Sequence, residues 1–267
     1  MVTHVRAAAT AADGADPLDE AATMALAHRG LDGARLWVAD DRGFALLRDG
    51  SLDLAVAPDA RSAGLGTALA DAALADASAG VTAWSHGDHP AAARLAAHVG
   101  FEPTRSLWVM RRTAGPVEVP TVKGVTVRGY RAGDAAGVLR VNAAAFAHHP
   151  EQGAMDEANL AERMAEPWFD PAGLLVAESD SGALLGFHWT KQHSAELGEV
   201  YVVAVDPAAQ GRGLGRLVTA AGLDHLAGLG VAEIELYVES DNTPAVSLYE
   251  RLGFVRAQTH VQYSRTG

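Results

Sequence analysis

The sequence predicts an α/β fold that is built twice in tandem, and two observations carry this prediction. One pattern, V-x-P-x-x-[RQ]-x-x-G-L-G, occurs at Val56–Gly66 and again at Val205–Gly215. Each copy is followed by an alanine- and leucine-rich helical stretch, a short β-type run, a second helical stretch and a Gly-Phe pair, Gly100-Phe101 or Gly253-Phe254. Self-similarity of this kind indicates repeated domains rather than one large one.

A short segment at 113–124 separates the two copies. It holds two prolines and two glycines, which favour extended or turn backbone over a helix. We therefore expect an N-terminal domain over residues 1–112, a linker over 113–124 and a C-terminal domain over 125–267. At 267 residues the chain is long enough for two buried cores.

The second copy shows its elements most clearly. Its residue patterns predict, in chain order, a strand at 125–130, helices at 133–146 and 156–166, strands at 173–178, 183–192 and 199–205, a helix at 213–228, a strand at 234–238, a helix at 243–251 and a last strand from Phe254. The run 199–205 is β-branched and aromatic and ends at Asp206-Pro207, as a central strand does. The N-terminal half repeats this order in shorter form.

The composition of the chain argues against several classes of protein function. The formal charge of −12, with no long run among 21 lysines and arginines, argues against a nucleic-acid binder. No stretch resembles a secretion signal or a membrane span, so we expect a cytoplasmic protein with no membrane partner. The absence of cysteine excludes disulfides, thiolate metal sites and a cysteine nucleophile.

The strand–loop–helix junction at Val205–Gly215 is the first candidate site. Glycines let backbone N–H groups approach a ligand, and the first turn of a helix adds unpaired N–H donors at a positive dipole end. Arg212 and Arg216 could add charge for phosphate oxygens. The junction therefore suggests a pyrophosphate cradle, or else a glycine-rich turn that serves packing alone. It matches neither a P-loop nor a dinucleotide fingerprint.

At this point the sequence resembles the GCN5-related N-acetyltransferase family. The second half of the resemblance is Asn242-Thr-Pro-Ala-Val-Ser-Leu-Tyr249-Glu-Arg-Leu-Gly253-Phe254, which follows the cradle after a helix and a strand. The resemblance covers residues 34–110 and 125–264. It implies an α+β fold in each half, a mixed and mostly antiparallel sheet flanked by helices, and acetyl-CoA as co-substrate.

Longer strings are similar to tandem-domain members of this family. They are 148–153, 168–171, 186–191, 198–203 and 236–242. The resemblance implies acetyl transfer to the cysteinyl amine of a cysteine–glucosamine–inositol conjugate, with the C-terminal domain catalytic. It also implies contacts to the hydroxyl groups of that conjugate by four polar residues in addition to Glu199, namely Glu20, Glu151, Lys191 and Tyr237.

Acetyl transfer to an amine needs a base for the ammonium proton, a polarised thioester carbonyl and a proton for the leaving thiolate. Glu199, at the start of the strand that leads into the cradle, suits the base. By the resemblance, Tyr249 protonates the thiolate, and the residues that hold acetyl-CoA are Val203, Ala204, Val205, Gln210, Gly211, Arg212, Gly213, Leu214, Gly215, Arg216, Asn242 and Ser247. The plainer interpretations are a solvated glutamate at a strand end and a core tyrosine.

The N-terminal copy lacks both reactive side chains. Alignment on the repeated valine puts Gly50 where Glu199 stands, and alignment on the Gly-Phe pair puts Ala96 where Tyr249 stands. Its cradle remains, so Leu54, Val56, Arg61, Gly64 and Gly66 could still hold acetyl-CoA without turnover, or the copy could be a structural wall of the acceptor site. Asp49 and Asp53 leave open a shifted base.

The sequence also allows other interpretations of the function. The same reaction could act on another amine, such as an aminoglycoside, a polyamine or a protein N-terminus. The alternative outside the enzymes is a non-catalytic acetyl-CoA sensor. The presence of both Glu199 and Tyr249 argues against it. His148, His149, His188 and His193 lack metal-ligand spacing, so we expect no metal. The internal pseudo-pair of domains makes us expect a monomer.

Overall fold

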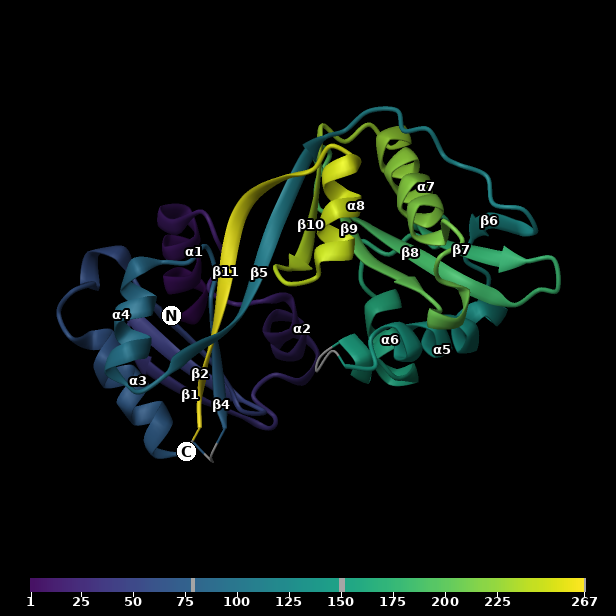
Figure 1. Cartoon of the computed structure of the whole chain (residues 1–267). Helices are drawn as coiled ribbons and strands as arrows, with labels where there is room; N and C mark the ends of the chain where they lie inside the picture. The colour runs from purple at the N-terminus through teal and green to yellow at the C-terminus, as the bar shows by residue number, and fades with distance from the viewer. Residues whose placement is uncertain (78–79, 149–151, 267) are drawn as a thin grey trace. The chain divides into compact units, whose positions relative to one another are not determined.

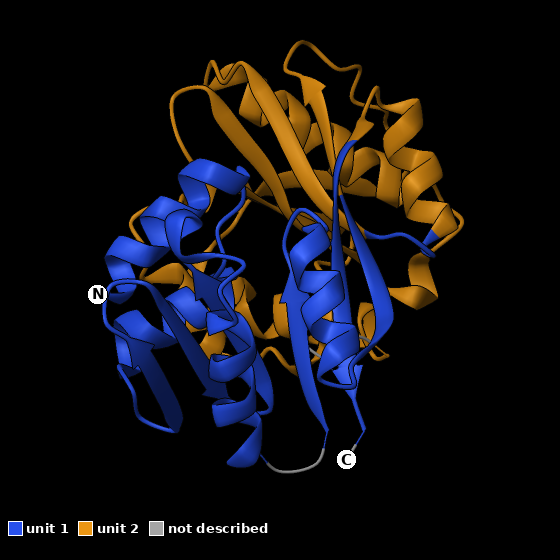
Figure 2. Cartoon of the chain, turned by 90° about the vertical axis from the view of Figure 1, so that its left-hand side faces the viewer, with its two compact units in different colours: residues 1–108, 239–242, 257–267 blue, residues 109–238, 243–256 orange. Residues whose placement is uncertain are grey.

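The computed structural model describes residues 1–77, 80–148 and 152–266. Its contacts divide the chain into two compact units (Figure 2). Unit 1 contains residues 1–108, 239–242 and 257–267, and unit 2 contains residues 109–238 and 243–256. Each unit therefore includes residues from both halves of the sequence. The boundaries expected at 112 and 125 stay a prediction.

Unit 1 is a mixed sheet with helices on both faces. Its helices are α1 (Val2–Asp13), α2 (Glu20–Arg29), α3 (Leu65–Ala75) and α4 (Pro90–His98). Its strands are β1 (Ala34–Ala39), β2 (Gly43–Arg48), β3 (Ser51–Val56), β4 (Val81–Ser85), the later part of β11 (Val255–Arg265) and the earlier part of β5 (Glu102–Thr113), in the spatial order β1-β2-β3-β4-β11-β5. The last strand of the chain thus lies between β4 and β5.

Unit 2 repeats the plan of a mixed sheet flanked by helices (Figure 1). Its strands are β6 (Val125–Gly129), β7 (Leu174–Ser179), β8 (Leu184–Gln192), β9 (Leu197–Val205) and β10 (Glu233–Glu239), in the order β10-β9-β8-β7-β6, with the end of β5 beside β10. Its helices are α5 (Ala135–Ala145), α6 (Glu157–Met164), α7 (Leu214–Gly228) and α8 (Thr243–Arg251). These elements agree with the segments predicted for the second half to within a few residues.

The two faces of the unit 2 sheet have different cores. On one face, Phe187, Trp189 and Val202 pack with residues of α5 and α6. On the other face α7 crosses β8 and β9 (Figure 1). There the imidazole of His188 fits against Gly222, so closely that a Cβ at Gly222 would lie 2.0 Å from the ring. This notch brings α7 close to the sheet and fixes where its N-terminus lies.

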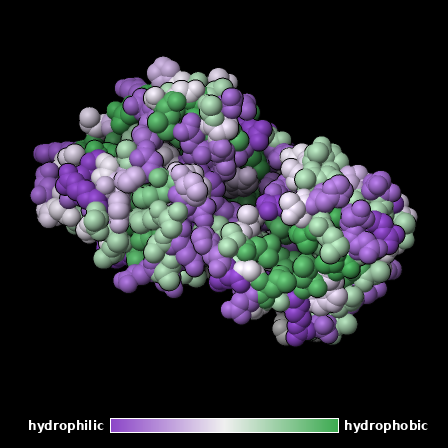
Figure 3. All heavy atoms as spheres, turned by 180° about the vertical axis from the view of Figure 1, so that it is seen from behind, coloured by the Kyte–Doolittle hydropathy of each residue, from purple (hydrophilic) through white to green (hydrophobic). Residues whose placement is uncertain are grey.

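The pairings confirm the expected fold class of mixed, mostly antiparallel sheets. In the described part of the chain, β3 pairs with β4 and β9 pairs with β10 in parallel, and in each case a helix, α3 or α7, connects the two strands. Hydrophilic residues are spread over both units on the face in Figure 3. In the described part of the chain, no helix is long and apolar enough to cross a bilayer.

Candidate active site

A β-bulge in β9 organises the candidate site. Trp189 of β8 pairs with Val202, but the next residue, Thr190, pairs with Val200, so Tyr201 is an extra residue on β9. Without the bulge, Glu199 and Val202 would point to opposite faces, because side chains alternate along a strand. The bulge brings Glu199, Tyr201 and Val202 to the α5 side of the sheet.

Glu199 is buried in a row of charged residues that crosses four strands. Its register partners are Lys191 on β8 and Glu235 on β10. Glu199 is 6% exposed and Glu235 is 4% exposed. Two carboxylates side by side repel each other, and Arg111 of β5 offsets one of them by donating two hydrogen bonds, at 2.8 and 3.0 Å, to Oε2 of Glu235. Glu199 is therefore a buried carboxylate in a structured setting and not a solvated strand end.

Aromatic rings line the same face beside Lys191. The Lys191 ammonium lies 4.7 Å from the ring centroid of Trp168 and 5.3 Å from that of Tyr201. Trp168 and Tyr201 are themselves in edge contact, with centroids 5.0 Å apart. Cation–π contacts of this kind hold a cation in place without neutralising it. The sequence predicted Lys191 but missed both rings, since Tyr201 reaches this face only through the bulge.

The cradle has the geometry that a pyrophosphate needs. Gly213 is the N-cap of α7 with φ 84°, and Gly211 has φ 77° with open space where a Cβ would point. Gln210, Gly211, Arg212, Gly213 and Arg216 are all exposed, whereas Leu214 is buried beneath them. The 15-residue helix α7 directs its first N–H groups at this opening. These residues fit an anionic, phosphate-bearing ligand.

Divergence of two parallel strands supplies a place for an extended ligand. The paired residues of β9 and β10 end at Val200 and Leu236, and among the described residues no later residue of β9 is paired with β10. The edge of Val203, Ala204 and Val205 that faces β10 therefore has no strand partner. Peptide-like amides of a ligand can bond to such an edge as an added strand would.

Tyr249 lies on α8, on the side of the sheet where Leu248 of α8 approaches the start of α7 at Gly215. Its side chain is 8% exposed and meets Phe254 edge-on, with centroids 5.8 Å apart. Burial raises the pKa of Tyr249 to about 12, so the phenol keeps its proton at neutral pH. Ser247 is half-buried on the same helix.

The other predicted residues belong to several parts of the chain. Asn242 and Glu20 belong to unit 1, where Asn242 is exposed in the turn before α8 and Glu20 is the half-buried first residue of α2. Glu151 lies outside the described residues. Tyr237, 44% exposed, is two residues beyond Glu235 on β10 and so on the same face of the sheet.

The unit 1 register corrects one alignment made from sequence. Strand β3 pairs with β2 without a bulge, and Ser51 pairs with Arg48 as Glu199 pairs with Lys191. Ser51, not Gly50, therefore occupies the position of Glu199. The sequence alignment was off by one residue because it could not count the extra residue in β9. A serine hydroxyl is no base at neutral pH, so the inference that this copy lacks the carboxylate is unchanged.

The two aspartates near that position are not equivalent. Asp49 is exposed in the β2–β3 turn, while Asp53 is 7% exposed on β3. Burial, with a contribution from the charge of Asp19, raises the pKa of Asp53 to about 7, and Arg48 opposes this. Asp53 lies two residues from Ala55, which packs with α1 and α2, and so faces the same side.

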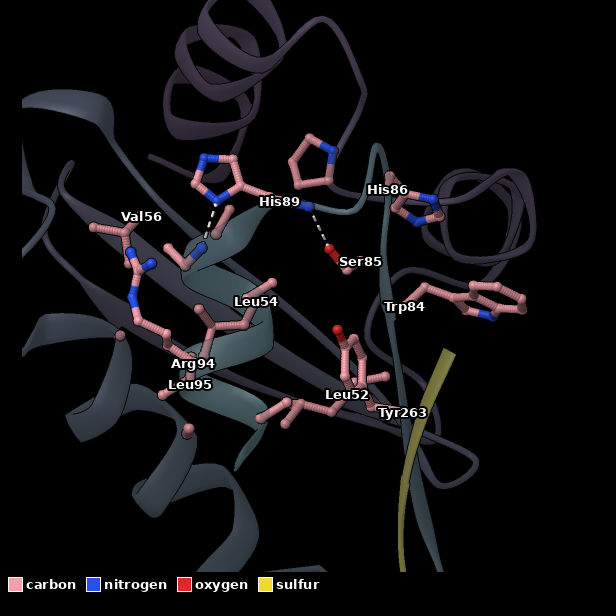
Figure 4. Close-up of a pocket in the computed structure, with 18 of the residues that line it drawn as sticks. Leu52, Leu54, Val56, Trp84, Ser85, His86, His89, Arg94, Leu95 and Tyr263 are labelled. Atoms are coloured by element: carbon pink, nitrogen blue, oxygen red, sulfur yellow. Dashed lines mark hydrogen bonds between the residues drawn. The ribbon is translucent and has the colours of Figure 1, made fainter. Parts of the chain in front are cut away.

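Unit 1 contains a pocket of about 660 Å³ where β3 and β4 diverge (Figure 4). Its lining includes all five residues predicted for an N-terminal acetyl-CoA site, Leu54, Val56, Arg61, Gly64 and Gly66. Ala96 lines it too, and Tyr263 of β11 projects into it. Arg61 donates hydrogen bonds to both carboxylate oxygens of Asp13, at 2.8 and 2.7 Å. Its guanidinium is thus engaged by a carboxylate at the mouth of this cradle.

His188 and His193, two of the histidines considered from the sequence, do not form a cluster, and His149 lies outside the described residues. His188 is fully buried under α7, whereas His193 is 34% exposed beside Glu199. In the described ranges no group of three or more His, Asp or Glu side chains is arranged to hold a metal ion.

Comparisons with known proteins identify the family of the chain. Residues 142–254 match the model of the acetyltransferase (GNAT) family. The chain is 58% identical to a mycothiol acetyltransferase of Nocardioides sp., over 99% of this chain and 96% of that protein. A GCN5-related N-acetyltransferase structure from Sphaerobacter thermophilus is 27% identical with a TM-score of 0.74, covering 99% of this chain and 91% of that one. A tandem GNAT protein from the clavulanic acid pathway, 20% identical, shares the fold with a TM-score of 0.66 over 88% and 83% of the two chains.

Proposed function

Because the chain belongs to the mycothiol acetyltransferase family of GNAT enzymes, we propose that it performs the last step of mycothiol biosynthesis. In this reaction an acetyl group passes from acetyl-CoA to the cysteinyl amine of the cysteine–glucosamine–inositol conjugate. The chain is an acetyl-CoA-dependent N-acetyltransferase, and its acceptor is a small molecule. We place the reaction in the cytoplasm and expect a monomer to carry it out.

One observation supports the assignment of unit 2 as the catalytic unit. A single strand, β9, carries a buried carboxylate near its start and leads at its end into a glycine-rich helix N-terminus. A base and a phosphate cradle are thus fixed on one rigid element. The unit 1 strand that corresponds to it has a serine in place of the carboxylate.

In the proposed mechanism the cradle residues 210–216 hold the pyrophosphate, and the free edge of Val203–Val205 holds the pantetheine arm and the thioester carbonyl. Glu199 removes a proton from the acceptor ammonium, directly or through water. The amine attacks the thioester carbon, and Tyr249 gives a proton to the departing thiolate. Burial raises the pKa of Tyr249, so the phenol is protonated and can donate when the thiolate departs.

The acceptor would lie on the α5 side of the sheet. There Lys191, held against Trp168 and Tyr201, and Tyr237 offer donors and ring faces for a polyhydroxylated ligand. Glu20, Glu151 and Asn242 remain assigned by resemblance alone. We propose that unit 1 either keeps acetyl-CoA in its pocket without turnover or serves as structure.

The test is a steady-state assay with acetyl-CoA and the conjugate, in which acetylated product is followed by mass because the acceptor's thiol would react with thiol dyes. Product acetylated on nitrogen, with a higher kcat/KM than aminoglycosides, polyamines or peptides give, supports the proposal. Faster turnover of another amine would reassign the acceptor. Binding of acetyl-CoA without turnover of any amine would favour the sensor.

A further inference from the structure

His193 occupies a special position next to the proposed base. It follows β8 directly and begins the short connection to β9, where its N–H bonds to the carbonyl of Leu197 at 2.9 Å. Ser194 closes this connection by accepting hydrogen bonds from the N–H groups of Glu196 and Leu197. The imidazole extends over β9, and its Nε2 lies 2.7 Å from Oε2 of Glu199.

The charged groups around His193 come from four strands. Lys191 precedes it on β8 and lies on the same face, and Glu199 is on β9. On β10, Oε1 of Glu235 lies 3.9 Å from Nε2 of His193. Arg111 of β5 holds the other oxygen of Glu235. Of the two carboxylates, Glu199 therefore makes the shorter contact with His193, and Glu235 is held by Arg111.

The two side chains of this pair differ in their exposure to solvent. The side chain of Glu199 is 8% exposed, whereas that of His193 is 34% exposed. A proton that reaches Glu199 therefore has a route to water through the imidazole, which has two nitrogens that can bind and release protons.

The reaction requires such a route. When the acceptor enters as R–NH3⁺, the balanced reaction is R–NH3⁺ + CH3CO–SCoA → R–NH–COCH3 + HSCoA + H⁺. Of the two protons that leave nitrogen, one replaces the proton that the thiolate takes up and the other passes to solvent. A buried base must therefore lose one proton in every turnover before it can act again.

We propose that His193 is a positioning residue that holds the Glu199 carboxylate toward the acceptor and passes its proton to solvent. This inference rests on the proposed function. In the resting pair the Nε2–H of the neutral imidazole donates to the Glu199 carboxylate. Once Glu199 is protonated, exchange with water moves the imidazole proton to Nδ1, Nε2 accepts the Glu199 proton, and the imidazolium releases its Nδ1 proton to water, which restores the Nε2–H donor. No covalent bond other than these N–H and O–H bonds changes.

The experiment compares His193→Ala, His193→Gln and Glu199→Gln in the full chain, with the exposed His4→Ala on α1 as matched control. We expect His193→Ala to lose about 10²-fold in kcat, the lower end for a placed proton-transfer group, while KM for acetyl-CoA is unchanged. Added imidazole should restore kcat in His193→Ala and should not restore it in Glu199→Gln. His193→Gln, which keeps an N–H donor but cannot accept a proton, should stay slow.

Each of these results tests the proposed proton transfer from Glu199 through His193 to solvent. A wild-type kcat in His193→Ala, a loss that imidazole does not restore in a variant with wild-type circular dichroism, or full activity in His193→Gln would each overturn it. Failure of the proposed function looks different, because wild type and His4→Ala would then also yield no acetylated conjugate.

Discussion

Acidification should loosen α7 because of one buried imidazole. His188 is 0% exposed, and its Nδ1 lies 3.0 Å from the carbonyl oxygen of Val218 on α7. Burial lowers its pKa from 6.5 to about 4, with the hydrogen bond to Val218 opposing the shift. Below pH 6.5 the unfolded chain therefore takes up a proton that the folded chain refuses until about pH 4. The free energy of unfolding falls across that window as the pH decreases.

The two pKa values set the size of the effect. At pH 5 the unfolded imidazole is almost fully protonated and the folded one is mostly neutral, so the loss from this residue is about 2 kcal/mol relative to pH 7. It grows to roughly 3 kcal/mol near pH 4. His188→Leu, which cannot titrate, should lack this contribution whatever its stability at pH 7.

Hydrogen exchange of the α7 amides at pH 7 and pH 5, corrected for intrinsic exchange rates, measures the opening free energy of this helix directly. Wild type should lose about 2 kcal/mol more than His188→Leu between the two pH values. Equal losses in the two proteins would refute the argument, because His188 would then titrate alike in the folded and unfolded chains.

Further predictions concern the site and its support. Tyr249→Phe should lower kcat by about 10²- to 10⁴-fold in the conjugate assay with little change in the acetyl-CoA dissociation constant; an unchanged kcat would remove its assigned role. Glu199→Gln should slow turnover most at low pH, where more acceptor is protonated, so a pH-independent loss would contradict a base. Gly222→Ala should lower the melting temperature sharply, since its Cβ would lie 2.0 Å from the His188 ring, and an unchanged melting temperature would show that the notch relaxes. Gly213→Val, at φ 84°, should weaken acetyl-CoA binding in calorimetry, and wild-type affinity would exclude this turn from the cradle.

Periodicity and repetition predicted the elements of the second half well, because helices and strands there follow their own hydrophobic patterns. Residues 199–205, for example, lie within β9 at Leu197–Val205. The glycine-rich turn before α7 was also predictable, since the positive φ at Gly211 and Gly213 favours glycine, whereas its role as a phosphate cradle stays a prediction.

Features that depend on the register between strands could not be predicted from the sequence. No residue pattern marks Tyr201 as the extra residue of a bulge, so the sequence alignment placed Gly50 instead of Ser51 opposite Glu199. Likewise His193 contacts Glu199 and Arg111 contacts Glu235 only because four strands align, and no local sequence pattern at His193 or Arg111 predicts these contacts.

The course of β11 has a consequence for any attempt to divide this protein. The end of the chain is built into unit 1 between β4 and β5, where Val261 pairs with Ser85 and Arg265 with Val81. Expression of residues 1–112 alone would leave a slot in the middle of a sheet, and residues 125–267 alone would carry a loose strand with unpaired backbone groups. Both fragments would be prone to aggregate. Neither copy of the repeat is therefore expected to fold properly by itself, and a division of the chain into working parts would have to follow the path of this strand instead of the boundary of the repeat.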